Sequence, residues 1–142
     1  MYGDTNNEDR AIWAENAIGA AEDTDVAAGA AIVKAFDAET AHGGDTRMIY
    51  GENDEDLQDL VTDFLCDLGH YCDEEGQCTD AYFQSLGVDT GTESSEAVDP
   101  IISNATQAVK AFAESRGFEW QRRVDIAYMH FIDDNDEEDE AA

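Results

Sequence analysis

Basic residues are scarce in this sequence. Seven Lys and Arg stand against 35 Asp and Glu, which gives a formal net charge of -28 at pH 7. Proteins that bind the phosphates of DNA or RNA need clustered Lys and Arg, and here only Arg122 and Arg123 are adjacent. Direct nucleic-acid binding is therefore not expected.

Proline, cysteine and long apolar runs are also scarce. The single proline and three cysteines exclude a collagen-like or disulfide-rich chain. The sequence contains no run of 18 or more apolar residues, which is the length that a membrane-spanning helix needs. Its start, MYGDTNNEDR, lacks the basic and apolar segments of a signal peptide. We therefore expect a cytoplasmic protein that does not enter a membrane.

The residues that are present favour a folded chain. Hydrophobic residues make up 42% of the sequence, which is more than acidic disordered chains carry. A length of 142 residues suits one domain. We predict a single helical domain over residues 1–132, with a loop or linker at 87–99, followed by a disordered acidic tail at 133–142.

Apolar residues recur at helical spacing, so the fold class predicted is all-α, a small bundle of four to six helices. The clearest helix is 54–73, where Gly69 is an interior exception that indicates close packing. We expect this helix to pack against 101–116 and 118–132. Further helices are predicted at 7–21, 25–40 and 78–86, with an extended piece at 46–50. Asp99 and Pro100 are typical of an N-cap and a first helical position.

The surface that this composition predicts suits concentrated salt. At about 1 M salt the Debye length is roughly 3 Å, so the repulsion between neighbouring carboxylates is screened. The acidic, lysine-poor balance resembles the proteins of salt-accumulating halophilic archaea and their viruses. A second interpretation is that the carboxylates imitate DNA and occupy a DNA-binding protein.

One face of the helix at 54–73 carries carboxylates and a histidine. Asp56, Asp59, Asp63, Asp67 and His70 follow steps of three and four residues. The simpler interpretation is the acidic outer face of an amphipathic helix. The alternative is a metal site in which Asp59, Asp63, Asp67 and His70 hold Mg²⁺ or Mn²⁺, which prefer oxygen ligands and can bind phosphate groups.

The remaining candidates are histidine, tryptophan and cysteine residues. His130 would share a site with His70 if their helices pack antiparallel. Trp13 and Trp120 fit either core positions or anchors of an interface. The three cysteines, separated by five residues each, lack the paired spacing of a structural zinc site, so we expect reduced thiols.

The helical motifs resemble those of small uncharacterised helical proteins of tailed phages and related mobile elements. Such proteins carry an early Trp-Ala, a run of the form D-L-L-x-D-L-x-H-x-x-D and, after a Gly, a closing A-x-x-H-Y. The matching residues here are Trp13-Ala14, Asp59-Leu60, Asp63, Leu65, Asp67 to His70, Asp73, Gly117 and Ala127 to Phe131. Phe131 replaces the Tyr, and residues 77–116 form an insertion. The resemblance implies a helical fold and a viral or mobile-element origin, and it singles out His70 and His130 without implying a reaction.

Together these features predict a non-enzymatic acidic accessory protein of a halophilic archaeon or its virus, which acts by binding a protein partner. Self-association is compatible with the sequence, and no cofactor is expected. The alternative function is a divalent-metal-dependent hydrolase of nucleotides or other phosphorylated small molecules. A DNA-mimic inhibitor is the third hypothesis.

Overall fold

Six α-helices form the part of the chain that the structure describes. In this computed structural model, that part comprises residues 7–20, 23–40, 54–74, 79–88 and 98–141. The helices are α1 (Asn7–Ile18), α2 (Val26–Thr40), α3 (Asp54–Glu74), α4 (Thr79–Ser85), α5 (Pro100–Ser115) and α6 (Trp120–Ala141). No strand occurs among these residues, which confirms the all-α prediction. The expected extended piece at 46–50 and most of the expected loop at 87–99 lie outside the described residues.

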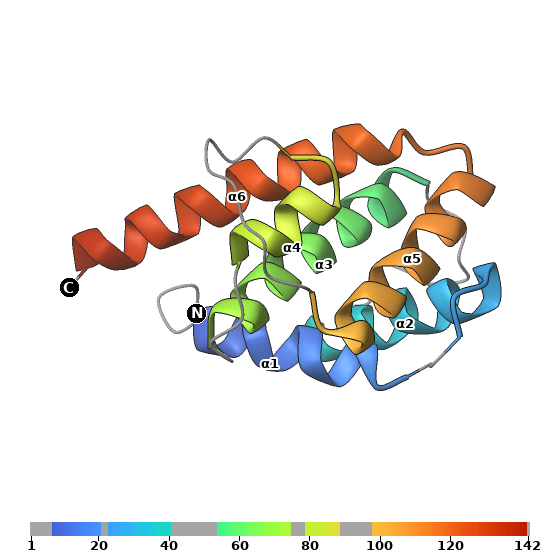
Figure 1. Cartoon of the computed structure of the whole chain (residues 1–142), viewed down its shortest axis with the longest axis horizontal. Coiled ribbons are helices and arrows are strands. Elements are labelled where there is room, and N and C mark those ends of the chain that lie inside the picture. Colours follow the sequence, from blue (N-terminus) through green and yellow to red (C-terminus); the bar gives the residue numbers. More distant parts are fainter. Residues whose placement is uncertain (1–6, 21–22, 41–53, 75–78, 89–97, 142) are drawn as a thin grey trace.

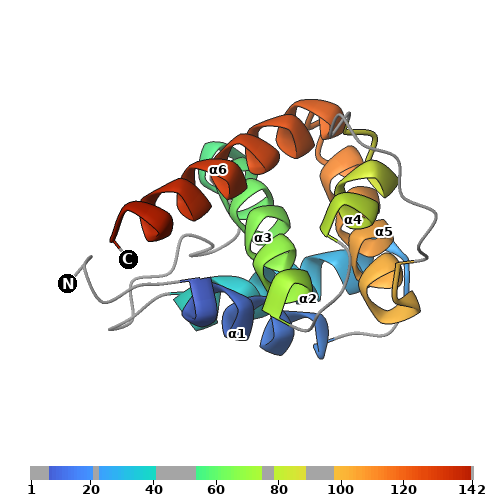
Figure 2. The ribbon, with the colours of Figure 1, turned by 60° about the vertical axis from the view of Figure 1, so that its left-hand side comes forward.

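Helix α3 is the centre of the bundle. Figure 2 shows it between α1 on one side and α6 on the other. Its apolar stripe is fully buried, as the helical spacing predicts, because neighbouring helices cover that face along most of its length. The stripe consists of Leu57, Leu60, Val61, Phe64, Leu65 and Leu68.

Helix α5 packs mainly against α2, and less against α3 than the sequence led us to expect. The reason lies at Gly29 on α2. A Cβ atom built there would overlap the backbone carbonyl of Ala108 and lie 2.7 Å from the Cβ of Phe112. The two backbones therefore cross at a distance that only glycine permits, and α2 takes the place beside α5.

Capping residues fix where α2 and α5 begin. The Asp99 carboxylate accepts a hydrogen bond from the backbone N–H of Ile101 at 2.9 Å, and Pro100 occupies the first turn, which confirms the predicted N-cap. At α2 the carboxylate of Asp25 accepts from the N–H of Ala28 at 2.9 Å. Gly117, with φ +81°, lets the chain turn after α5 and enter α6.

Helix α6 runs along the bundle and extends past the other helices at its C-terminal end (Figure 1). It includes the predicted helix at 118–132 and continues through the acidic segment to Ala141, with side chains described as far as Asp133. Within the described ranges, no helix is both long enough and apolar enough to cross a membrane.

Candidate functional site

The acidic stripe of α3 passes from solvent into the core. Asp59 is exposed and Asp63 is half-buried, whereas Asp67 is 6% exposed and His70 is completely buried. The exposure falls because α4 and α6 cover the last turns of α3, where a Cβ on Gly69 would lie 2.8 Å from the Phe83 ring. The four predicted metal ligands therefore lie at very different depths.

His70 belongs to an aromatic cluster in the core. Its ring lies 4.7 Å from the ring of Phe131, centroid to centroid, at an interplanar angle of 36°. Phe131 in turn lies 5.1 Å from Phe83. His70 is thus packed as a core residue between α3 and α6, away from solvent.

His130 precedes Phe131 on α6 but is not part of the buried core. Its side chain is exposed and lines a cleft of about 310 Å³ between α3 and α6, named here the α3–α6 cleft. The residues that line it are Asp59, Thr62, Asp63, Arg123, Ile126 and His130. The structure therefore brings Asp59, Asp63 and His130 to one place and leaves Asp67 and His70 outside it.

Arg123 lines the α3–α6 cleft and was not predicted as a site residue. It is only 8% exposed, and its Nη1 donates to the hydroxyl of Thr62 at 3.5 Å. That hydroxyl donates in turn to the carbonyl of Gln58 at 2.9 Å. Within the described chain, the buried Nε of Arg123 has no hydrogen-bond partner. The signal in the sequence was its position seven residues before His130, which places both on one face of α6.

The charges in the α3–α6 cleft do not cancel. Among the described residues that line it, Asp59 and Asp63 contribute two negative charges and Arg123 one positive charge, with His130 counted as neutral, so their formal sum is one negative charge. A cationic or hydrogen-bond-donating group fits such a cleft better than an anion does.

The described residues offer no ready set of metal ligands. In the stretches of chain that the structure describes, no three His, Cys, Asp or Glu side chains are placed to hold one metal ion. Cys66 and Cys72 are buried cysteines, and Cys78 lies outside the described residues. The Mg²⁺ or Mn²⁺ site on Asp59, Asp63, Asp67 and His70 stays a prediction.

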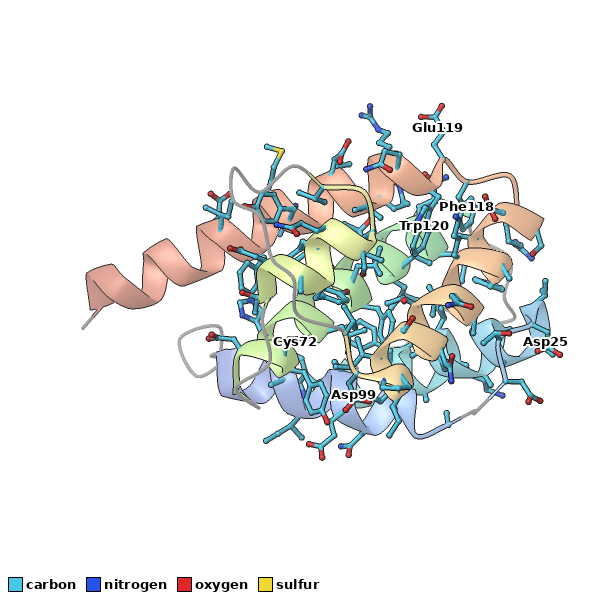
Figure 3. All side chains as sticks on the ribbon, in the orientation of Figure 1. Asp25, Cys72, Asp99, Phe118, Glu119 and Trp120 are labelled. Atoms are coloured by element: carbon cyan, nitrogen blue, oxygen red, sulfur yellow. The ribbon has the colours of Figure 1, made fainter. Side chains whose placement is uncertain are left out.

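The tryptophans are both partly buried against the core. Trp13 lies on α1, and Trp120 begins α6. Figure 3 shows Trp120 between α5 and α6, whereas the neighbouring Glu119 points outward. Both tryptophans therefore pack against the core, and each side chain remains partly exposed.

Helix α6 also exposes large apolar side chains next to the α3–α6 cleft. Met129 is 62% exposed and Ile132 is 41% exposed, and we call these two residues the α6 apolar pair. Met129 follows the cleft residue Ile126 by three positions, so apolar surface continues from the cleft onto the outside of α6. Elsewhere Ile12, Val26 and Ile101 are exposed on other helices.

Comparison of the chain with protein-family models, with curated proteins and with solved structures gives no match. The geometry of α3 and α6 is therefore the basis for the functional proposal.

Proposed function

We propose that this protein is a non-enzymatic acidic accessory protein that binds a basic, amphipathic segment of a protein partner on the surface formed by α3 and α6. The observation that carries the proposal is the α6 apolar pair, Met129 and Ile132, exposed beside a cleft of negative formal charge. Isolated apolar residues on a surface are common, but these two are spaced by three residues and continue into the cleft.

Each part of this surface has a matching part in such a partner. A Lys or Arg side chain would enter the α3–α6 cleft and meet the carboxylates of Asp59 and Asp63. Apolar side chains one helical turn away would pack on Met129 and Ile132, and methionine adapts well to varied partners. A basic helix therefore fits the surface in both charge and spacing.

The net charge of -28 supports an origin in a halophilic archaeon or its virus. At about 1 M KCl the Debye length is roughly 3 Å, so only charges in direct contact still attract, and the apolar pair must supply much of the affinity. The free energy of unfolding should rise between dilute buffer and about 1 M KCl, as urea denaturation would show. A value independent of salt would contradict this origin.

The resemblance of the helical motifs to those of tailed-phage and mobile-element proteins supports a viral or mobile-element source. The genomic neighbourhood of the coding sequence tests this part of the proposal. Flanking phage or integrase genes are expected, and a position within a conserved host operon would contradict it.

The binding surface is tested by adding charge to it. Met129→Glu or Ile132→Glu should weaken partner binding about tenfold or more, because burying either side chain contributes about 1.5–3 kcal/mol. Ile101→Glu is the matched control, since Ile101 is 63% exposed on a different helix. Each tagged variant is used for affinity capture from a haloarchaeal lysate in about 1 M KCl, with quantification by mass spectrometry.

A partner retained by the wild type and by Ile101→Glu, but lost from Met129→Glu, supports the proposal. A partner retained equally by all three, or no partner from protein shown to be folded, contradicts it. If duplex DNA competes for the captured partner at the same salt concentration, the DNA-mimic hypothesis replaces it.

A further inference from the structure

A second cleft lies apart from the α3–α6 surface, at the junction of α4, α5 and α6. It has a volume of about 210 Å³ and shares no residue with the α3–α6 cleft. We call it the Trp120 cleft. Its lining consists of Ser85, Leu86, Ser103, Thr106, Gln107, Lys110, Trp120 and Gln121.

The Trp120 cleft differs from the rest of the molecule in charge. Of 142 residues in the chain, 35 are Asp or Glu, yet none of those that the structure describes lines this cleft. Lys110, one of only two lysines, does line it. Among the residues that the structure describes, none forms a hydrogen bond or ion pair with the Lys110 side chain.

One face of α5 supplies the polar wall of the cleft. Ser103, Thr106, Gln107 and Lys110 follow steps of three, one and three residues, which place them on the same side of the helix. The side-chain amide of Gln107 donates to the hydroxyl of Ser103 at 3.3 Å, and the Thr106 hydroxyl donates to the Ser103 carbonyl at 2.8 Å. These bonds hold the wall in a defined arrangement.

The opposite wall comes from the start of α6. Trp120 lies between α5 and α6 (Figure 3), and its indole N–H makes no hydrogen bond to any residue that the structure describes. Gln121 donates to the carboxylate of Asp125 at 3.0 Å and to the carbonyl of Gly87 at 3.5 Å, which ties α6 to the end of α4. The cleft therefore combines an aromatic side chain with two donors, the Lys110 ammonium and the Trp120 indole N–H, that have no partner among the described residues.

We propose that the Trp120 cleft binds a small planar organic anion, a carboxylate or a phosphate monoester, whose ring packs on Trp120 and whose charged group pairs with Lys110. Donors without partners favour a ligand that brings acceptors, and an ammonium group favours one that brings negative charge. A volume of about 210 Å³ suits a ligand of one ring and one charged group. In about 1 M salt, the distant carboxylates of the protein are screened, whereas Lys110 in direct contact with the ligand is not.

The test uses the full chain in about 1 M KCl and follows the indole N–H signals of its two tryptophans by NMR. The Trp13→Phe variant assigns the signal of Trp120. Benzoate and phenyl phosphate are the probes for the two kinds of anion, and benzamide is the uncharged molecule of matching shape. We expect saturable shifts of the Trp120 signal with at least one anion and weaker binding of benzamide.

Lysine variants show whether the charge acts locally. Lys110→Gln should weaken anion binding about tenfold, because a hydrogen bond to a charged group contributes about 1.5–3 kcal/mol. Lys34→Gln removes the only other lysine, which is exposed on α2, and should leave binding unchanged. Lys110→Arg keeps the charge and should retain binding. Circular dichroism checks that each variant is folded.

Three results would overturn the proposal: no shift of the Trp120 signal, equal binding of benzamide and the anions, or equal weakening by Lys34→Gln and Lys110→Gln. Partner capture through the α3–α6 surface should be unaffected by Lys110→Gln. Failure of this inference is therefore distinguishable from failure of the proposed function.

Discussion

At the scale of single residues, Tyr82 is a polar side chain whose pKa is changed by burial in the core. It is 1% exposed, and its hydroxyl donates to the carbonyl of Leu65 at 2.8 Å. Burial raises the pKa of the phenol well above its ordinary value of about 10. Electrostatic interaction with Cys72, Cys66 and Asp67 raises the pKa further. The folded protein therefore keeps Tyr82 protonated under conditions that ionise it in the unfolded chain.

This pKa predicts how stability depends on alkaline pH. Below about pH 10 the tyrosine is neutral in both states, and its contribution to stability is fully present. Above that pH the unfolded chain loses the proton while the folded protein retains it, so the free energy of unfolding falls as pH rises. Tyr82→Phe should make this fall shallower, and should cost about 1 kcal/mol at neutral pH because a hydrogen bond is lost.

Urea denaturation between about pH 8 and pH 11 measures both effects. Tyr128→Phe, at a half-buried tyrosine of α6, is the control substitution. Identical alkaline slopes for the wild type and Tyr82→Phe would show that Tyr82 does not carry this pH dependence.

At the scale of helices, the crossing of α2 and α5 depends on the absence of one side chain. A Cβ atom on Gly29 would meet backbone atoms of Ala108, which cannot move without displacing α5. The Ala-rich sequence of α2 keeps the rest of this contact close. The pairing of α2 with α5 is thus set by backbone proximity more than by large side chains.

Gly29→Ala should destabilise the protein by about 3 kcal/mol, because overpacking outweighs the gain in helix propensity of about 1 kcal/mol. Gly19→Ala is the matched control, since an added Cβ there would have no neighbour closer than 3.5 Å. Urea denaturation of both variants gives the comparison. Equal stability of the two variants would contradict the close crossing of α2 and α5.

The helices themselves could be predicted from the sequence, because each long helix has an apolar stripe and several have capping residues. The close packing expected at Gly69 is confirmed by its approach to Phe83 and Phe131. How deeply each residue of a helix is buried could not be predicted from the sequence. Helical spacing gives the angular position of Asp59 and His70 but not which turns other helices cover. The pairing of α2 with α5 was missed because it depends on backbone proximity at Gly29.

The residues of the α3–α6 cleft could likewise be predicted only in part from the sequence. His130 and the exposed carboxylates could be selected from sequence, since their spacing on each helix is regular. Arg123 could not be predicted as a site residue, because in sequence it is only one of two adjacent arginines, which is too little for a nucleic-acid contact. Its burial beside Thr62 follows from how α3 and α6 meet, and one-dimensional spacing does not contain that information.

At the scale of the whole molecule, the protein carries two clefts of opposite character on a strongly acidic chain. Counted over the described residues, the α3–α6 cleft has negative formal charge and adjoins the α6 apolar pair, whereas the Trp120 cleft contains Lys110 and no carboxylate. This arrangement separates the surface proposed for a basic protein segment from the site proposed for a small anion. Both depend on direct contacts, which are the interactions that persist in concentrated salt.

Hydrogen exchange tests the central claim, binding of a partner on α3 and α6, most directly. Exchange is measured for the free protein and for its complex with the captured partner, both in about 1 M KCl. The account predicts added protection in α3 around residues 59–63 and in α6 around residues 126–132, with none at the start of α5. Protection confined to α5, or spread evenly over the chain, would contradict it.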